Sequence, residues 1–178
     1  MEPPQPITTE RLLLRRTRLT DAAAVFDYAS DPEVTRYLTF TPKTRQSEAS
    51  DFLRKCDAAW SAGDAFALAI THLGDENVLG VIEARSSVHG VELAYVLRRS
   101  AWGNGYMTEA ARAVIDSALG DTSVFRVWAY VDTHNVASQR VLDRVGMIRE
   151  GTLHRWMVHP NVADEPSDVF MYSLWREA

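Results

Sequence analysis

The sequence predicts an α+β fold, with a mostly antiparallel, seven-stranded sheet, helices on both faces and one parallel crossover. Three observations predict it. Segments with a strand-like apolar pattern are interleaved with segments of helical period, in the order strand, two helices, three strands, helix, strand, helix, two strands. No repeat or linker interrupts this order. The 178 residues, of which 46% are hydrophobic, suffice for one core, so we expect a single domain over residues 1–178.

The first half of the chain alternates between helix and strand signals. Residues 10–17 predict a first strand, and apolar residues at helical spacing predict helices over residues 19–30 and 41–63, the second ending at Gly63. Three strand-like runs follow, separated by glycine-containing turns, and predict a consecutive antiparallel meander. These runs cover residues 65–73, 77–86 and 90–98.

The second half begins with a helix that follows two glycines, Gly103 and Gly105, and stops at Gly120. The next run, residues 123–131, carries apolar residues on both faces, as expected of a strand in the sheet interior. One more helix and two strands complete the order, over residues 135–146, 147–158 and 167–175. We expect strand 90–98 to connect to strand 123–131 by a right-handed parallel crossover, with a ligand cleft at that junction.

Composition excludes several function classes. The formal net charge of -5 argues against nucleic-acid binding and is compatible with amine substrates. Cys56 is the only cysteine, so no intrachain disulfide and no cysteine zinc site is expected. The five histidines show no metal-ligand spacing, and we expect no metal. No apolar run has the length of a signal peptide or a membrane span, so we expect a cytoplasmic protein without a membrane partner.

The two glycines at the mouth of the predicted helix indicate an anion site. Glycine lets the main chain approach a ligand closely, and free amides with the helix dipole favour a negative charge there. A Walker-type phosphate loop is excluded because Tyr106 and Met107, not Lys and Ser/Thr, follow Gly105. The dinucleotide fingerprint lacks its third glycine, which is Thr108 here, so a nicotinamide oxidoreductase is a weak alternative.

The run RRSAWGNGYMTEAA, followed roughly 30 residues after Gly105 by NVASQRVLDRVGM, resembles the two central motifs of the GNAT superfamily of acyl-CoA-dependent N-acetyltransferases. It is most similar to the Rim-type branch, which includes ribosomal-protein N-terminal acetyltransferases. The family loop has a polar first residue and a small last one, where this chain has Trp102 and Met107; the tryptophan is usual in the Rim-type branch. The resemblance covers nearly the whole order of elements and implies a GNAT-like sheet.

By resemblance, acetyl-CoA is the acyl-donor cosubstrate. The loop amides would hold its pyrophosphate, the end of strand 90–98 would pair with its pantetheine arm, and residues of helix 135–146 would face it. The cofactor-binding residues implied are Val96, Leu97, Arg98, Trp102, Gly103, Asn104, Gly105, Tyr106, Met107, Thr108, Asn135, Ser138 and Arg140. These residues also have purely structural interpretations. Asn135 could be a helix N-cap, Ser138 could lie on a polar helix face, and each arginine could be a surface charge.

A substrate ammonium must lose a proton before it attacks a thioester. The family often uses a carboxylate on the strand before the loop, and Glu92 falls there; the alternative for Glu92 is an ion-paired strand residue. First-turn Glu109 reads more simply as a helix-dipole partner or a partner of Arg112. Ser138 is the candidate that protonates the departing thiolate, and a main-chain N–H near Leu97 or Arg98 is the candidate oxyanion donor.

The sequence thus predicts an N-acetyltransferase that moves an acetyl group from acetyl-CoA to a primary amine by direct attack with general-base assistance. The acceptor is a small molecule or a peptide N-terminus. A small-amine enzyme acting on a polyamine, amino sugar or antibiotic stays open, as does a non-catalytic acyl-CoA sensor. The resemblance also leaves a homodimer open.

Overall fold

The computed structural model describes residues 3 and 5–176, and the predicted domain bounds 1–178 therefore include positions 1–2, 4 and 177–178, which lie outside the described residues. One sheet of eight strands runs through the molecule in the order β1-β2-β3-β4-β5-β6-β8-β7. Its strands are β1 (Ile7–Thr8), β2 (Leu12–Arg16), β3 (Ala65–His72), β4 (Gly80–Ser87), β5 (Gly90–Leu97), β6 (Arg126–Asp132), β7 (Ile148–Met157) and β8 (Ser167–Trp175). The seven predicted strands are confirmed, and the two-residue β1 is an addition too short to show a sequence period.

The predicted helices are confirmed, each with shifted ends. They are α1 (Ala22–Ala29), α3 (Gln46–Ala62), α4 (Tyr106–Gly120) and α5 (Val136–Arg144). A short α2 (Pro32–Thr35) was not predicted; Asp31 caps it by accepting a hydrogen bond from the Glu33 N–H. Two 3-10 turns, Leu19–Asp21 and Arg99–Ala101, precede α1 and follow β5.

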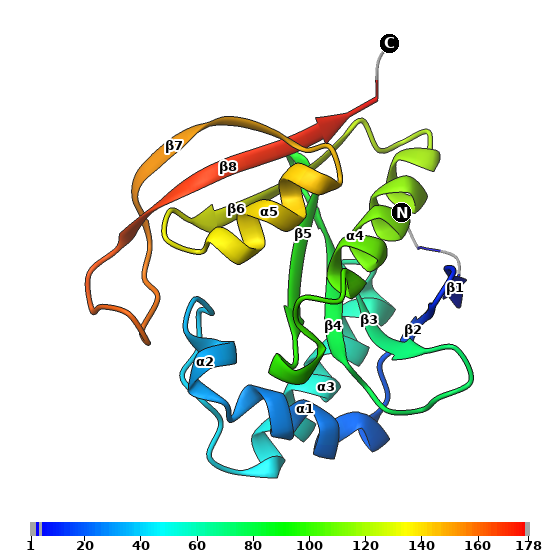
Figure 1. The fold of residues 1–178 in the computed structure, drawn as a ribbon. Helices are drawn as coiled ribbons and strands as arrows, with labels where there is room; N and C mark the ends of the chain where they lie inside the picture. The colour runs from blue at the N-terminus through cyan, green and yellow to red at the C-terminus, as the bar shows by residue number, and fades with distance from the viewer. Residues whose placement is uncertain (1–2, 4, 177–178) are drawn as a thin grey trace.

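Helices cover both faces of the sheet, as predicted (Figure 1). Neighbouring residues of one strand face opposite layers: in β4, Val81 packs with the cluster under α1 and α3, whereas Ile82 packs with the cluster under α4 and α5. Ile82 is fully buried, and Val114 and Ile115 of α4 are at most 2% exposed. The two apolar layers fix both helix pairs against a common sheet.

The sheet is antiparallel except where β5 meets β6. This parallel pair is short, with only Val91 opposite Val127 and Glu92 opposite Trp128. Beyond Glu92 the two strands diverge, while β5 stays paired with β4 and β6 with β8. The divergence opens a gap in the middle of the sheet, at the crossover where the sequence predicts a ligand cleft (Figure 1).

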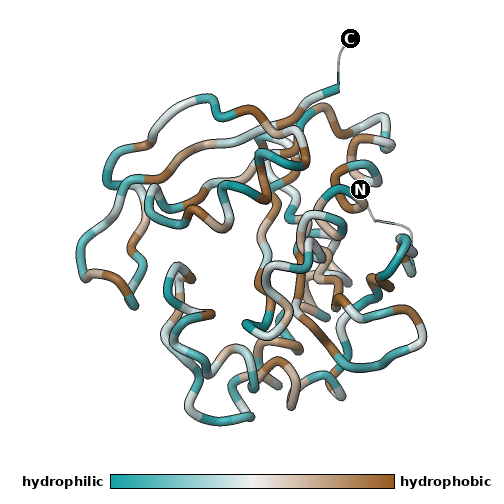
Figure 2. Tube along the Cα trace, in the orientation of Figure 1, coloured by the Kyte–Doolittle hydropathy of each residue, from teal (hydrophilic) through white to brown (hydrophobic). Residues whose placement is uncertain are grey.

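None of the helices in the described part of the chain combines the length and apolar character needed to cross a membrane. Figure 2 shows hydrophobic residues in short stretches interrupted by hydrophilic ones.

Candidate active site

The loop from β5 to α4 ends in a helix start without a side-chain cap. Gly105 occupies the N-cap position with φ 77°, in the left-handed region that glycine tolerates best. Because glycine has no side chain to accept from them, the first-turn amides of Tyr106, Met107 and Thr108 receive no side-chain cap. An uncapped helix N-terminus behind a glycine loop suits a pyrophosphate, so the residues present fit the predicted ligand.

The large side chains of this loop point away from those amides. Met107 is 6% exposed and lies in the core cluster under α4. The Tyr106 ring packs edge-on against His72 of β3. Trp102 donates its indole N–H to the Leu97 carbonyl oxygen at 2.7 Å, which ties the loop to the end of β5. Met107, larger than the residue usual in the family, is therefore accommodated in the core and leaves the predicted anion site open.

The two arginines among the predicted cofactor-binding residues, Arg98 and Arg140, lie in different surroundings. Arg98 forms an ion pair with Asp27 of α1 at 2.8 Å, and its backbone N–H donates to the Leu79 carbonyl oxygen. Of the two candidate oxyanion amides, that of Arg98 is thus already engaged, and Leu97 is left as the candidate. Arg140 is exposed on α5 and lines neither of the two cavities described below.

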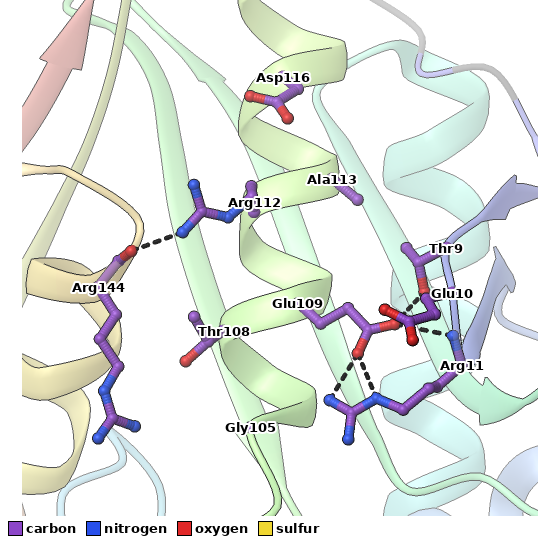
Figure 3. A pocket seen from close by; sticks show the side chains of 10 residues that line it. All are labelled: Thr9, Glu10, Arg11, Gly105, Thr108, Glu109, Arg112, Ala113, Asp116 and Arg144. Atoms are coloured by element: carbon purple, nitrogen blue, oxygen red, sulfur yellow. Dashed lines mark hydrogen bonds and ion pairs between the residues drawn. The ribbon is translucent and has the colours of Figure 1, made fainter.

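A groove of about 460 Å³ runs along the outer side of α4 (Figure 3). Gly105 and Thr108 line it among the predicted residues. Glu109 binds Arg11 of the β1–β2 connection at 2.6 Å and accepts a hydrogen bond from the Thr9 hydroxyl. The Glu109–Arg112 pair considered from the sequence does not form, because Arg112 reaches across to the carbonyl oxygen of Arg144 at the end of α5.

A second cavity, of about 500 Å³, passes through the gap between β5 and β6. It is lined by residues from both faces of β5: Leu93 and Tyr95 belong to the layer under α4 and α5, whereas Val96 packs with the layer of α1 and α3. By strand alternation Glu92 lies on the Val96 face. The cavity therefore joins the two faces of the sheet, and Glu92, Val96, Asn135 and Ser138 are the predicted site residues that it brings together.

Glu92 is 18% exposed and forms an ion pair with Arg85 of β4 at 3.3 Å. Arg85 also holds Glu83, whose carboxylate lies 2.8 Å from its Nε. Glu92 is therefore ion-paired in the structure, as the alternative interpretation of this residue expected. A pairing partner on one oxygen leaves the rest of the carboxylate free to accept a proton.

Asn135 and Ser138 form the start of α5. The Asn135 side-chain oxygen accepts a hydrogen bond from the Ser138 N–H, so the N-cap reading of Asn135 is correct. The Ser138 hydroxyl lies 2.7 Å from the hydroxyl of Tyr95 on β5, a residue that sequence reasoning missed. Burial raises the pKa of the Tyr95 phenol, which keeps its proton.

The lining of the cavity is acidic on balance. Its charged residues are the carboxylates Glu48, Asp51, Glu83, Glu92 and Asp132 and the cationic Lys43, Lys55 and Arg85. His159, from the segment after β7, also lines it. Across residues 3 and 5–176, no group of three or more His, Cys, Asp or Glu side chains is placed to hold a metal ion.

Comparison with known proteins gives one consistent family. The model of the acetyltransferase (GNAT) domain matches residues 11–148. A Bacillus licheniformis protein named N-acetyltransferase p20 is 31% identical over 175 residues, which cover 97% of each chain. The solved GNAT-family acetyltransferase of Bacillus anthracis superposes with a TM-score of 0.85 at 26% identity, over 96% of this chain and 98% of that one. RimL, a ribosomal L7/L12 alpha-N-protein acetyltransferase solved with coenzyme A, has the same fold, with a TM-score of 0.85 at 19% identity over 96% and 98%.

Proposed function

Since the chain belongs to the GNAT acetyltransferase domain family, it is an acetyl-CoA-dependent N-acetyltransferase, and we propose that its acceptor is the amine of a peptide or protein N-terminus. The observation that supports transfer to an amine at this site is the cavity through the gap between β5 and β6. A passage that joins the two faces of a sheet lets two substrates approach from opposite sides and meet at the diverging strands. The acetyl donor would enter beside α4 and α5, and the amine beside α1 to α3.

On the donor side, the proposed contacts follow the predicted residues. The amides of Gly103 to Thr108 would hold the pyrophosphate, because they lie at an uncapped helix start. The end of β5 at Val96 and Leu97 would lie along the pantetheine arm, because β5 has left β6 at this point. Acetyl-CoA supplies an acetyl group activated as a thioester.

On the acceptor side, the acidic balance of the cavity favours a cation, which is the form of an amine at neutral pH. We propose that Glu92 accepts a proton from the attacking nitrogen, directly or through water, and that the Leu97 N–H donates to the developing oxyanion. The Tyr95–Ser138 hydroxyl pair would return a proton to the thiolate. The preference for a peptide acceptor rests on the Rim-type loop and on the fold shared with RimL.

The test is a thiol-release assay with acetyl-CoA. The acceptor panel contains peptides beginning with Ser, Ala or Met, and polyamines, amino sugars and free amino acids. Turnover confined to peptides supports the proposal. Turnover on a small amine alone would replace the peptide acceptor with a metabolite or antibiotic. Tight acetyl-CoA binding without thiol release across the panel would indicate a sensor.

A further inference from the structure

His159 is a buried histidine in the wall of the cavity that none of the steps above uses. Its side chain is 3% exposed, and it follows β7 in a segment anchored to the chain after α2, which also lines the cavity. Asn161 provides that anchor, because its side-chain amide donates to the carbonyl oxygens of Thr35 and Phe40 at 2.7 and 2.8 Å. The ring of Tyr37 meets the imidazole edge-on from the segment after α2. His159 therefore stands on the side of the sheet that faces the proposed acceptor.

One ring nitrogen of His159 is held by a buried acid. Nδ1 lies 3.1 Å from Oδ2 of Asp132, the last residue of β6, and 2.9 Å from the Ser167 hydroxyl. Ser167 has a single hydroxyl proton, and its acceptors are the same Asp132 oxygen at 2.6 Å and the Met157 carbonyl oxygen at 3.2 Å. Nδ1 must therefore carry its own hydrogen. This network assigns the tautomer in which Nε2 has a free lone pair.

The charge states agree with this assignment. Burial opposes ionisation of Asp132, but hydrogen bonds from Ser167 and from the His134 N–H outweigh it and hold the pKa of Asp132 below its ordinary value. Burial lowers the pKa of His159, and the neighbouring Asp132 offsets only part of this effect. At neutral pH the pair is thus a carboxylate beside a neutral imidazole.

Few titratable groups face His159. Asp132 approaches from β6 and the Tyr37 ring from the segment after α2. His134 binds the other oxygen of Asp132 through its Nδ1 at 3.2 Å, but its own side chain is 79% exposed. Within the described residues, the hydrogen bonds of the His159 ring are all at Nδ1, and His159 is among the residues that line the cavity.

We propose that His159, held by Asp132, binds the ammonium group of the acceptor at Nε2 and takes its first proton. This step rests on the proposed function, because it requires an amine acceptor in this cavity. The ammonium N–H bond breaks, its electrons stay on nitrogen, and Nε2 gains the proton to form an imidazolium that the Asp132 carboxylate stabilises. The neutral amine then attacks the thioester.

This proposal separates two proton transfers. An ammonium loses one proton before attack and a second after the carbon–nitrogen bond has formed. His159 takes the first proton and releases it to solvent, whereas Glu92 takes the second near the reacting carbonyl. A neutral imidazole suits the first task better than Glu92, since the carboxylate of Glu92 is ion-paired with Arg85.

The kinetic test compares His159→Gln with the wild type over pH 6 to 9, on an acceptor peptide that turns over. Glutamine places an amide near Nε2 but cannot take a proton. The variant must therefore use amine that is already neutral, which is about 1% of a peptide α-amino group at pH 6, because its pKa is near 8. We expect kcat/KM to fall about 10²-fold at pH 6 and only a few-fold at pH 9. An equal loss at every pH, or none, would overturn the proposal.

The matched control is His154→Gln, because the His154 side chain is 78% exposed, pairs with Asp168 and lines neither cavity. Its pH profile should follow that of the wild type. Asp132→Asn adds a test of positioning, because an amide that donates to Nδ1 forces the hydrogen onto Nε2. Its loss should match that of His159→Gln at pH 6, and the double variant should lose no more.

Nitrogen NMR of His159 in the wild-type protein reads the tautomer without any acceptor. A protonated Nδ1 and an unprotonated Nε2 at pH 7 are expected, and the reverse would overturn the assignment. Asp132→Asn should show the reversed pattern. If no acceptor of the panel is acetylated, the proposed function fails, and the His159 assignment is still decided by this spectrum.

Discussion

Tyr95 of β5 and Ser138 of α5 place their hydroxyl groups 2.7 Å apart across the gap where β5 leaves β6. Burial raises the pKa of Tyr95, so the phenol stays protonated and serves as a donor. When Tyr95 donates to the Ser138 oxygen, the Ser138 proton is free to point into the cavity. In the proposed reaction, the pair would form a short relay toward the leaving thiolate.

Replacing Ser138 by Ala removes the end of this relay. We expect kcat to fall roughly 10²-fold with an unchanged dissociation constant for CoA, because the lost proton matters only as the thiolate departs. Tyr95→Phe should lower kcat less, and the double variant should be no slower than Ser138→Ala. Thiol release gives the rates and calorimetry gives the affinity. Full turnover by Ser138→Ala would show that the thiolate leaves without this hydroxyl.

Glu92→Gln tests the proposed base near the thioester. Glutamine keeps the size of the side chain and an oxygen for Arg85, but it cannot take a proton. We expect kcat to fall about 10²-fold with little change in acetyl-CoA affinity. Glu76→Gln is the charge-matched control, since Glu76 is 79% exposed and lines neither cavity. An unchanged kcat at saturating acceptor would remove Glu92 from the mechanism.

Gly105→Ala separates backbone strain from ligand binding. A Cβ at Gly105 meets only Arg11 Nη2 at 3.6 Å, so the substitution strains the left-handed backbone without a steric clash. We expect a loss of about 1 kcal/mol in unfolding free energy and at least tenfold weaker acetyl-CoA binding, because the anion site depends on this backbone. Gly63→Ala is matched, with the same φ of 77° and open space around it. It should lose similar stability and bind acetyl-CoA normally. Equal affinities for the two variants would argue against the loop as the pyrophosphate site.

The order of elements could be predicted from the sequence because each helix and each long strand carries its own apolar period. The β1 strand has only two residues and carries none. The candidate site likewise contains residues that the sequence could reveal and residues that it could not. Glu92, Ser138 and the glycine loop lie in or beside local motifs, so the resemblance to a known family marks them.

The contacts that the sequence did not reveal join distant positions. Glu109 binds Arg11 rather than its helix neighbour Arg112, and those two partners are 98 positions apart. The assignment of His159 depends on Ser167 and Asp132, which are 35 positions apart and meet only because β8 pairs with β6. No spacing rule relates such residues. Tyr95 gave a weak signal, as an aromatic residue one strand position from the predicted cleft, but alternation placed it on the opposite face from Glu92.

A substitution of Glu150 tests which contacts hold the edge strand β7, which leads to His159, against the rest of the sheet. The Glu150 carboxylate pairs with Arg126 of β6 and accepts a hydrogen bond from Ser173 of β8, and these bonds lower the pKa of Glu150 from 4.5 to about 2.

A lowered pKa means that the stabilisation is complete above pH 4.5 and is lost as the pH falls toward 2. We expect Glu150→Gln to cost on the order of 1 kcal/mol at pH 7, since solvent screens this pair, whose side chains are 32% and 35% exposed. In urea titrations, the difference from the wild type should narrow as the pH falls from 5 to 3. Glu165→Gln is the charge-matched control, and it should cost much less at pH 7, because its ion pair with Arg155 is 68% and 78% exposed. A gap between Glu150→Gln and the wild type that stays constant with pH would mean that packing, and not the charge, holds β7.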